Sequence, residues 1–261
     1  MEERDHLLRY LATAVTAGRP VALATVVETQ RSVPRHAGAK MLAYADGSSL
    51  GTVGGGAMEA AVLTEALDAL RTGRPRLLEY DLLNPADGDP GICGGTVKIY
   101  LEPFMPAHTV YVIGCGHVGK SVVELAHWLG YRTVGIDDRA ELVSEEALPH
   151  ADIRFHGSIE EAVEKHPIGP DSSVVVVTRS TDLDAAVLPH VLSSPARYVG
   201  VMGSRTRWKS TSDRLLAAGI SAEELERVHS PIGIEVNAET LEEIAVSIMS
   251  EVIAVNRSPE R

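Results

Sequence analysis

The segment Gly114-Cys115-Gly116-His117-Val118-Gly119 combines the residues that a phosphate-binding turn requires, between an apolar run and a helical pattern. In such a turn the first glycine makes the bend, the second lets the backbone approach a pyrophosphate, and the third lets the helix pack on the strand. Asp137 ends the next apolar segment, where it can accept a ribose hydroxyl. The pattern predicts a dinucleotide-like phosphate site, with His117 as a loop side chain. The alternative is a Rossmann-shaped domain whose ligand is absent or different.

Three further loops in the first half of the chain, residues 29–40, 51–59 and 91–95, are together rich in glycine, and the first of them carries the cations Arg35 and Lys40. Each follows an expected strand, so we expect them to converge at one end of a sheet, where ligand sites form in α/β proteins. The candidate contact residues in these loops are Arg35, Lys40, Gly54, Gly55, Gly56 and Glu59. The alternative is three ordinary turns with surface cations.

The chain has two cysteines, which excludes a disulfide framework and indicates a reducing compartment. Cys93, between glycines, is the candidate for sulfur or catalytic chemistry; a small buried hydrophobe is the alternative. No CxxC, HExxH or clustered His and Cys spacing is present, so no metal site is predicted. Gly203 and Ser204 lie at the end of an expected strand and form a second candidate anion-binding turn.

The composition sets limits on partners and location. The 261 residues carry a formal net charge of −12, which argues against nucleic-acid binding and against docking to an anionic membrane. Neither a signal peptide nor an apolar run long enough to span a bilayer is present, so we expect a cytoplasmic protein without membrane insertion. Aromatic residues are only 4%, so the core must consist of Val, Ile, Leu and Ala.

The periodicity predicts two domains that together form an α/β protein. Residues 1–104 form a small mixed α/β domain, and the prolines at 102–108 mark its boundary. Its expected helices are 4–17 and 58–73, and its expected strands are 21–29, 41–47, 76–82 and 96–103. Residues 108–261 alternate strands and helices, which predicts a Rossmann-like parallel sheet followed by C-terminal helices.

The expected strands of the second domain are 109–114, 131–137, 172–178 and 197–203, and the helices between them are 120–130, 158–166 and 182–192. The tail is helical over 205–219, 220–228 and 239–255. Thr240 and Glu243 are spaced as a capping box. An apolar stripe of Leu241, Ile244, Ile248 and Val252 should face the core.

Six segments together resemble the xanthine dehydrogenase accessory factor family, XdhC/CoxI, from about Leu23 to Val255. They are "SVPRHAGAKML", "GTVGGGAMEAAV", "GICGG", "VIGCGHVG", "YVGVMGSR" and "SPIGIEVNAETLEEIAVSIMSEVIA". The resemblance implies an XdhC/CoxI-type N-terminal domain followed by a Rossmann-like XdhC C-terminal domain. This architecture agrees with the periodicity.

The resemblance also implies a maturation factor. Such proteins bind the molybdenum cofactor, a molybdopterin, and assist replacement of an oxo ligand by sulfido, with a cysteine desulfurase as sulfur donor. They pass the cofactor to a molybdenum hydroxylase of the xanthine dehydrogenase or carbon monoxide dehydrogenase type, and they are homodimers. Two alternatives stay open: an oxidoreductase that uses NAD(P), and a non-catalytic Rossmann scaffold.

The chain departs from the family pattern at four places. Ala57 stands where the family often has cysteine, and Arg31 and Asn237 stand where it often has glycine. Thr178-Arg179-Ser180-Thr181 replaces the Thr-His-x-His of many members.

Overall fold

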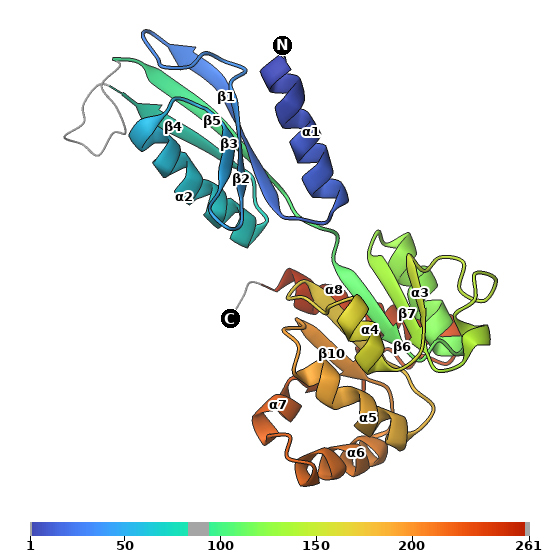
Figure 1. The fold of residues 1–261 in the computed structure, drawn as a ribbon. Helices are drawn as coiled ribbons and strands as arrows, with labels where there is room; N and C mark the ends of the chain where they lie inside the picture. The colour runs from blue at the N-terminus through green and yellow to red at the C-terminus, as the bar shows by residue number, and fades with distance from the viewer. Residues whose placement is uncertain (1, 83–93, 259–261) are drawn as a thin grey trace. The chain divides into compact units, whose positions relative to one another are not determined.

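The computed structural model describes residues 2–82 and 94–258, with side chains from His6 onward (Figure 1). The chain divides into two compact units, Met1–Pro106 and Ala107–Arg261. Among the described residues, no helix is both long and apolar enough to cross a membrane.

The first unit is a five-stranded antiparallel sheet with one helix on each face. The strand order is β3-β2-β1-β5-β4. The strands are β1 Val21–Gln30, β2 Lys40–Tyr44, β3 Ser49–Gly51, β4 Arg76–Asp81 and β5 Thr96–Phe104; the helices are α1 Glu2–Thr16 and α2 Gly56–Thr72. Alternate residues of β1 face opposite sides, so Val21 and Leu23 pack in the α1 cluster and Ala22 and Ala24 in the α2 cluster. Strand β3, only three residues long, was missed by the sequence interpretation.

The pairing register brings the glycine-rich loops to one end of this sheet. Gln30 pairs with Thr96, and Met41 pairs with Gly51, so the loop after β1, the segment after β3 and the residues before β5 share that end. A β-carbon on Gly54 would lie 3.1 Å from Cγ of Pro34, and one on Gly95 would lie 2.8 Å from Cγ1 of Val33. The loop of residues 31–39 therefore packs against the described parts of both other loops.

The second unit is a six-stranded parallel sheet in the order β11-β10-β9-β6-β7-β8. Its strands are β6 Thr109–Ile113, β7 Arg132–Asp137, β8 Ile153–His156, β9 Ser172–Val176, β10 Tyr198–Val201 and β11 Val228–His229. The chain runs outward from β6 to β8 and then returns to β9 on the other side of β6. This is the doubly wound order, with its switch point between β6 and β9. The short or half-buried strands β8 and β11 have no apolar run and were missed by the sequence interpretation.

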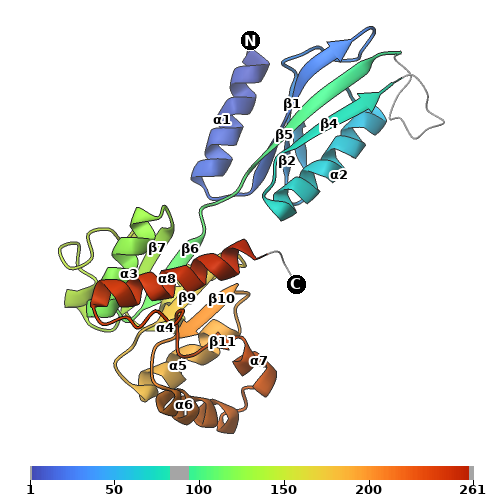
Figure 2. The same ribbon diagram turned by 180° about the vertical axis from the view of Figure 1, so that it is seen from behind.

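Helices cover both faces of the parallel sheet. The helices are α3 His117–Trp128, α4 Ile159–Lys165, α5 Thr181–Leu192, α6 Arg205–Ala217, α7 Ala222–Glu226 and α8 Leu241–Arg257. One core cluster contains residues of α3 and α8, which lie side by side in Figure 2, and the other contains residues of α4 to α7. Val174, Val175 and Val176 are fully buried because β9 is covered on both faces.

Helix α8 closes the fold as the pattern predicts, with one correction. Thr240 and Glu243 form the capping box, and Ile248 and Val252 are fully buried. Leu241 is instead 38% exposed, because it is the first helical residue and lies outside the core cluster. Ala245 and Met249 complete the buried stripe in its place.

Candidate functional site

The glycine turn of the second unit has the geometry that the motif predicts. Gly114 has a φ of 100°, in the left-handed region that favours glycine. A β-carbon on Gly119 would overlap the carbonyl oxygen of Gly114, so this glycine permits close contact between α3 and β6. Gly116, the N-cap of α3, faces open space, and His117 is exposed. The backbone at Gly116 is therefore accessible to a ligand.

Asp137 lies at the end of β7, where the sequence places it, but its carboxylate is already fully engaged. One oxygen accepts the Cys115 N–H at 2.7 Å and an Arg139 guanidinium N–H at 3.1 Å. The other accepts the backbone N–H of Arg139 at 3.0 Å and its Nε–H at 2.9 Å. The side chain is 1% exposed. Asp137 thus fixes the glycine turn, and it can accept a ribose hydroxyl only if Arg139 moves.

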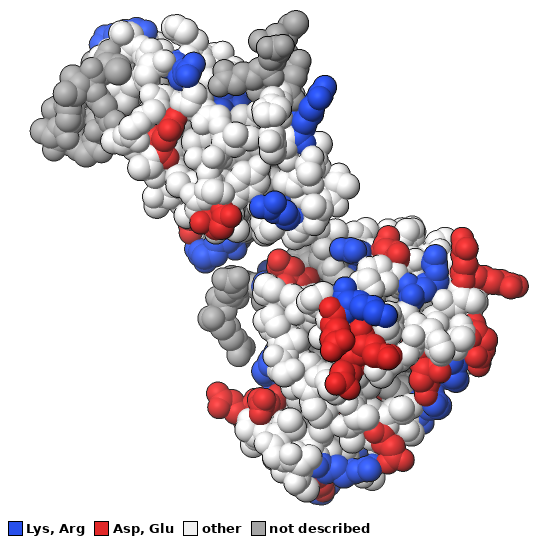
Figure 3. All heavy atoms as spheres, in the orientation of Figure 1, with Lys and Arg blue, Asp and Glu red and all other residues white. Residues whose placement is uncertain are grey.

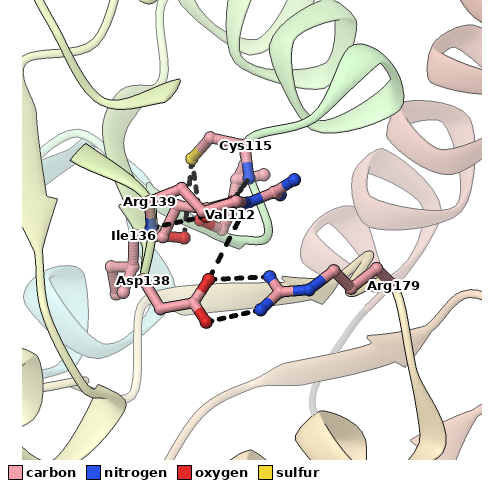
Figure 4. Close-up of polar contacts among 7 residues, drawn as sticks. Val112, Cys115, Ile136, Asp138, Arg139 and Arg179 are labelled. Carbon is pink, nitrogen blue, oxygen red and sulfur yellow. Dashed lines mark hydrogen bonds and ion pairs between the residues drawn. The ribbon is translucent and has the colours of Figure 1, made fainter. Parts of the chain in front are cut away.

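Cys115 is part of the core and not a reactive thiol. Its Sγ points toward the carbonyl oxygens of Ile136 at 3.5 Å and Val112 at 3.8 Å (Figure 4). Burial, and then the negative charge of Asp137, raises the pKa of the thiol to about 12. The thiol therefore stays protonated at neutral pH.

A pocket of about 380 Å³ opens beside this turn, at the carboxyl ends of β6 and β7 and against the starts of α4 and α5. This edge is where ligands bind in doubly wound sheets. Its apolar walls are Ile113, Ile136, Ile159, Leu183, Ala186 and Val187, and its polar rim is Asp137, Asp138, Arg139, Ser158, Thr178 and Arg179. Of the predicted site residues, Gly114 and Asp137 line the pocket.

An ion pair joins two parts of the pocket rim that are far apart in the sequence. The Arg179 guanidinium donates to both oxygens of Asp138, at 2.7 and 2.6 Å (Figure 4). Asp138 directly follows β7, whereas Arg179 follows β9. The hydrogen bond from Arg179 lowers the pKa of Asp138 to about 2. The sequence interpretation did not propose either residue for binding; the acidic pair at the end of β7 was the available signal.

The second candidate turn, at Gly203 and Ser204, is used within the fold. The Ser204 hydroxyl accepts the Arg207 N–H at 3.2 Å and caps α6. Arg207 in turn donates to Asp184, which is 1% exposed and also accepts the Thr178 hydroxyl at 2.6 Å. Gly203 and Ser204 are not among the residues that line the pocket. This network supports the segment after β9, which contributes Thr178 and Arg179 to the rim.

In the first unit, the start of α2 carries a carboxylate of its own. The Gly55 N–H donates to Glu59 at 3.0 Å, and the Thr52 hydroxyl donates to the same oxygen. Lys40 donates to the Thr25 hydroxyl at 2.9 Å, and Arg35 is exposed. Gly54 and Gly56 lie in the same turn, whereas Cys93 lies outside the described residues. The structure thus groups these loops, but Glu59 occupies part of the anion-binding backbone.

Two departures from the family pattern coincide with unusual backbone. Arg31 has a φ of 62° and Asn237 a φ of 53°, and they are the non-glycine residues with positive φ in the described part of the chain. Both stand where the resemblance indicates glycine. Asparagine adopts this conformation readily, whereas arginine does so at a cost.

Several charged side chains of the second unit form ion pairs, among them Arg179 with Asp138 and Arg214 with Asp182. On the face seen in Figure 3, basic and acidic side chains are interspersed. Within the residues that the structure describes, no group of three or more His, Cys, Asp or Glu could hold a metal ion. The charged groups that line the pocket are the carboxylates of Asp137 and Asp138 and the guanidinium groups of Arg139 and Arg179.

Both units match models of known protein families. Residues 110–252 match the model of the XdhC Rossmann domain, and residues 14–81 match that of the XdhC and CoxI family. The uncharacterized protein YqeB of Escherichia coli K12 is 34% identical over 92% of this chain, which spans only 44% of YqeB. The molybdenum cofactor insertion chaperone PaoD of the same organism is 25% identical over 98% of this chain and 90% of PaoD.

A solved structure of a Bacillus halodurans protein, described as a xanthine dehydrogenase, has the same fold. It is 23% identical, with a TM-score of 0.53 over 97% of this chain and 96% of that chain. The matched Rossmann domain alone covers more than half of the residues, and its glycine turn and parallel sheet are those described above. The chain therefore belongs to the XdhC and CoxI family.

Proposed function

We propose that this protein is an accessory factor that binds the molybdenum cofactor and delivers it to a molybdenum hydroxylase. The observation that carries the proposal is the match to the chaperone PaoD, which runs through 98% of this chain and 90% of PaoD. A match of that extent includes both units and not only a common nucleotide-binding fold.

Two features of the second unit support this ligand: the pocket and the open start of α3. The cofactor has a flat pterin system and a phosphate, and its dinucleotide forms have a pyrophosphate and a second ring. A volume of about 380 Å³ is within the usual range of small-molecule sites, and its apolar walls suit a ring. In the described part of the chain, no side chain caps Gly116 and the first turn of α3 has no acidic residue. The positive end of the α3 dipole therefore faces an open approach for a phosphate.

The proposal also includes a source of sulfur for the cofactor, a client enzyme and an oligomeric state. We propose Cys93 as the residue that handles sulfur, with a cysteine desulfurase as donor and a hydroxylase of the xanthine dehydrogenase or carbon monoxide dehydrogenase type as client. The working unit is proposed to be a homodimer. Cys93→Ser should lower sulfuration of the client without lowering cofactor binding; a variant that equals the wild type would assign Cys93 to packing.

An oxidoreductase that uses NAD(P) is less well supported by the site. Ribose recognition in that class depends on a carboxylate at the end of the second strand. Here the four hydrogen bonds to Asp137 occupy that carboxylate.

The test is whether the purified protein carries the cofactor. The chain is expressed in cells with intact molybdopterin synthesis, purified and oxidised, and the released pterin is measured by its fluorescence. We expect pterin to co-purify with the chain, and hydroxylase activity to be lost when the gene is deleted. Absence of pterin, together with unchanged hydroxylase activity, would refute the proposal. Tight NADH binding that Asp137→Ala weakens would instead favour the oxidoreductase.

A further inference from the structure

The two arginines at the pocket rim are held in different ways. Arg139 donates to Asp137 from both its backbone and its guanidinium, and the Asp137 side chain is 1% exposed. Within the part of the chain that the structure describes, Arg179 donates only to Asp138. Both side chains of that pair are nearly half exposed, Arg179 at 48% and Asp138 at 46%. Water screens an exposed pair, so Arg179 can change partner more readily than Arg139.

Because the Asp137 carboxylate already accepts four hydrogen bonds, it limits which part of a ligand can bind at this edge of the sheet. Both carboxylate oxygens already accept two hydrogen bonds each. A sugar hydroxyl that donates to Asp137 would have to displace one of these donors from a buried site, which is costly. Among the side chains at this edge, recognition therefore depends on the exposed guanidinium of Arg179.

The geometry of the Arg179–Asp138 pair is also the geometry of phosphate recognition. A guanidinium binds carboxylate and phosphate alike through two parallel N–H bonds. Arg179 makes such a fork with Asp138, at 2.7 and 2.6 Å, and lines the same pocket as the apolar walls. A phosphate attached to a ring in the pocket is therefore a direct competitor of Asp138.

The carboxylate that is displaced would not be left without a cation. One oxygen of Asp138 already lies 3.8 Å from Nε of Arg139. The Arg139 guanidinium keeps its hydrogen bonds to Asp137, so it offers Asp138 a nearby positive charge and not a second pair of hydrogen bonds. The rim thus has two arrangements that differ in which anion Arg179 holds.

We propose that Arg179 is the phosphate-recognising residue of this pocket, and that Asp138 occupies it until the phosphate of a phosphorylated heterocycle takes its place. The ligand class is a nucleotide or a pterin phosphate. Arg179 recognises its phosphate, and no ribose diol has to bind Asp137. This inference rests on the proposed function only in taking the pocket as the ligand site.

The test compares two variants that should act in opposite directions. Binding of cytidine 5′-monophosphate and of neopterin monophosphate to the full chain is measured by calorimetry, with cytidine and neopterin as probes that lack the phosphate. Asp138→Asn removes the competitor, and we expect up to about fivefold tighter binding of a phosphorylated probe. Arg179→Gln removes a charged donor, and we expect about tenfold weaker binding or more.

A matched control is available in the same unit. Asp182 and Arg214 form an exposed ion pair at 2.6 Å, and neither residue lines the pocket. Asp182→Asn also removes one negative charge, so it should leave binding of the phosphorylated probes within about twofold of the wild type if only the local exchange matters. Comparing the affinities of the two phosphorylated probes shows whether the pocket prefers a nucleotide or a pterin ring.

The inference is overturned if Asp138→Asn does not tighten binding of either phosphorylated probe, or if Asp182→Asn tightens it equally. It is also overturned if no phosphorylated probe binds the wild type or Asp138→Asn at millimolar concentration, or if cytidine and neopterin respond to Arg179→Gln as their phosphates do. In each of these cases pterin carried by the purified wild type would still support the proposed function, so the two failures are distinguishable.

Discussion

Two glycine-rich segments lead into helices in this protein, and their carboxylates lie in different places. Before α2, the N-cap N–H of Gly55 is bound by Glu59, which belongs to the first turn of the same helix. Before α3, Asp137 comes from the neighbouring strand and binds the N–H of Cys115, one residue before the N-cap Gly116. The first helix start is closed by its own acid, whereas the second is fixed in shape and left open.

The comparison separates two properties that glycine content alone does not distinguish. Glycine shows where the backbone can bend or be approached. An external anion can bind the N–H groups at a helix start, and be stabilised by the helix dipole, only if no carboxylate of the protein already occupies them. We therefore expect the turn before α3 to bind the ligand, and the turn before α2 mainly to stabilise its own unit.

The largest effect is expected from Gly119→Ala. A β-carbon there overlaps the Gly114 carbonyl oxygen, so we expect the second unit to lose roughly 2–3 kcal/mol of stability. Gly116→Ala is the control, since nothing lies within 4 Å of its β-carbon. Trp128 and Trp208, the two tryptophans of the chain, both lie in the second unit, so fluorescence can follow its unfolding. Equal stability of the two variants would contradict the close packing of α3 on β6.

The next largest effect is on binding. Gly116→Val places a branched side chain at the open N-cap of α3, and we expect at least about a tenfold loss of cofactor retention with little change in unfolding temperature. Gly169→Val is the matched control, because its β-carbon would meet only Ser172 Oγ, at 4.0 Å, away from the pocket. Full retention by Gly116→Val would show that this turn is not a phosphate cradle.

A smaller effect is expected at the first turn. Glu59→Ala removes the acceptor for Gly55 and Thr52, so the first unit should lose about 1 kcal/mol of stability, measured by calorimetry. Glu59→Gln keeps an acceptor oxygen and should lose less. Neither variant should increase cofactor retention. An increase with Glu59→Gln would mean that this turn also binds an anion, and the contrast between the two turns would no longer hold.

The smallest expected effect is a change in the stability of the second unit at low pH. Because Arg179 lowers the pKa of Asp138 to about 2 from an unfolded value of 3.8, the pair stabilises the fold above pH 3.8 and loses this contribution as the pH falls toward 2. Arg179→Gln should raise the pKa of Asp138 toward 3.8, and carbon NMR of the carboxyl group can follow its titration. A midpoint near 2 in that variant would show that Arg179 is not the cause.

Local patterns were sufficient for most of the secondary structure. The turn at Gly114, the capping box of α8 and the buried strand β9 depend on residues close together in the sequence, and all three are present. Residues 153–156 and 228–229 were missed, because such short strands are defined by their neighbours in the sheet. Leu241 was assigned to the core because periodicity does not show where a helix starts to meet the sheet.

The sequence by itself determined the two-part α/β pattern, the glycine turn and the acidic residue that ends the second strand of the parallel sheet. Only the tertiary structure decided how those groups are used. Asp138 and Arg179 are 41 positions apart, and they meet because strand order places the ends of β7 and β9 on either side of β6. The same folding saturates Asp137 and forms the pocket beside it. Hydrogen bonds between distant segments depend on the order of strands, which no local pattern of residue types encodes.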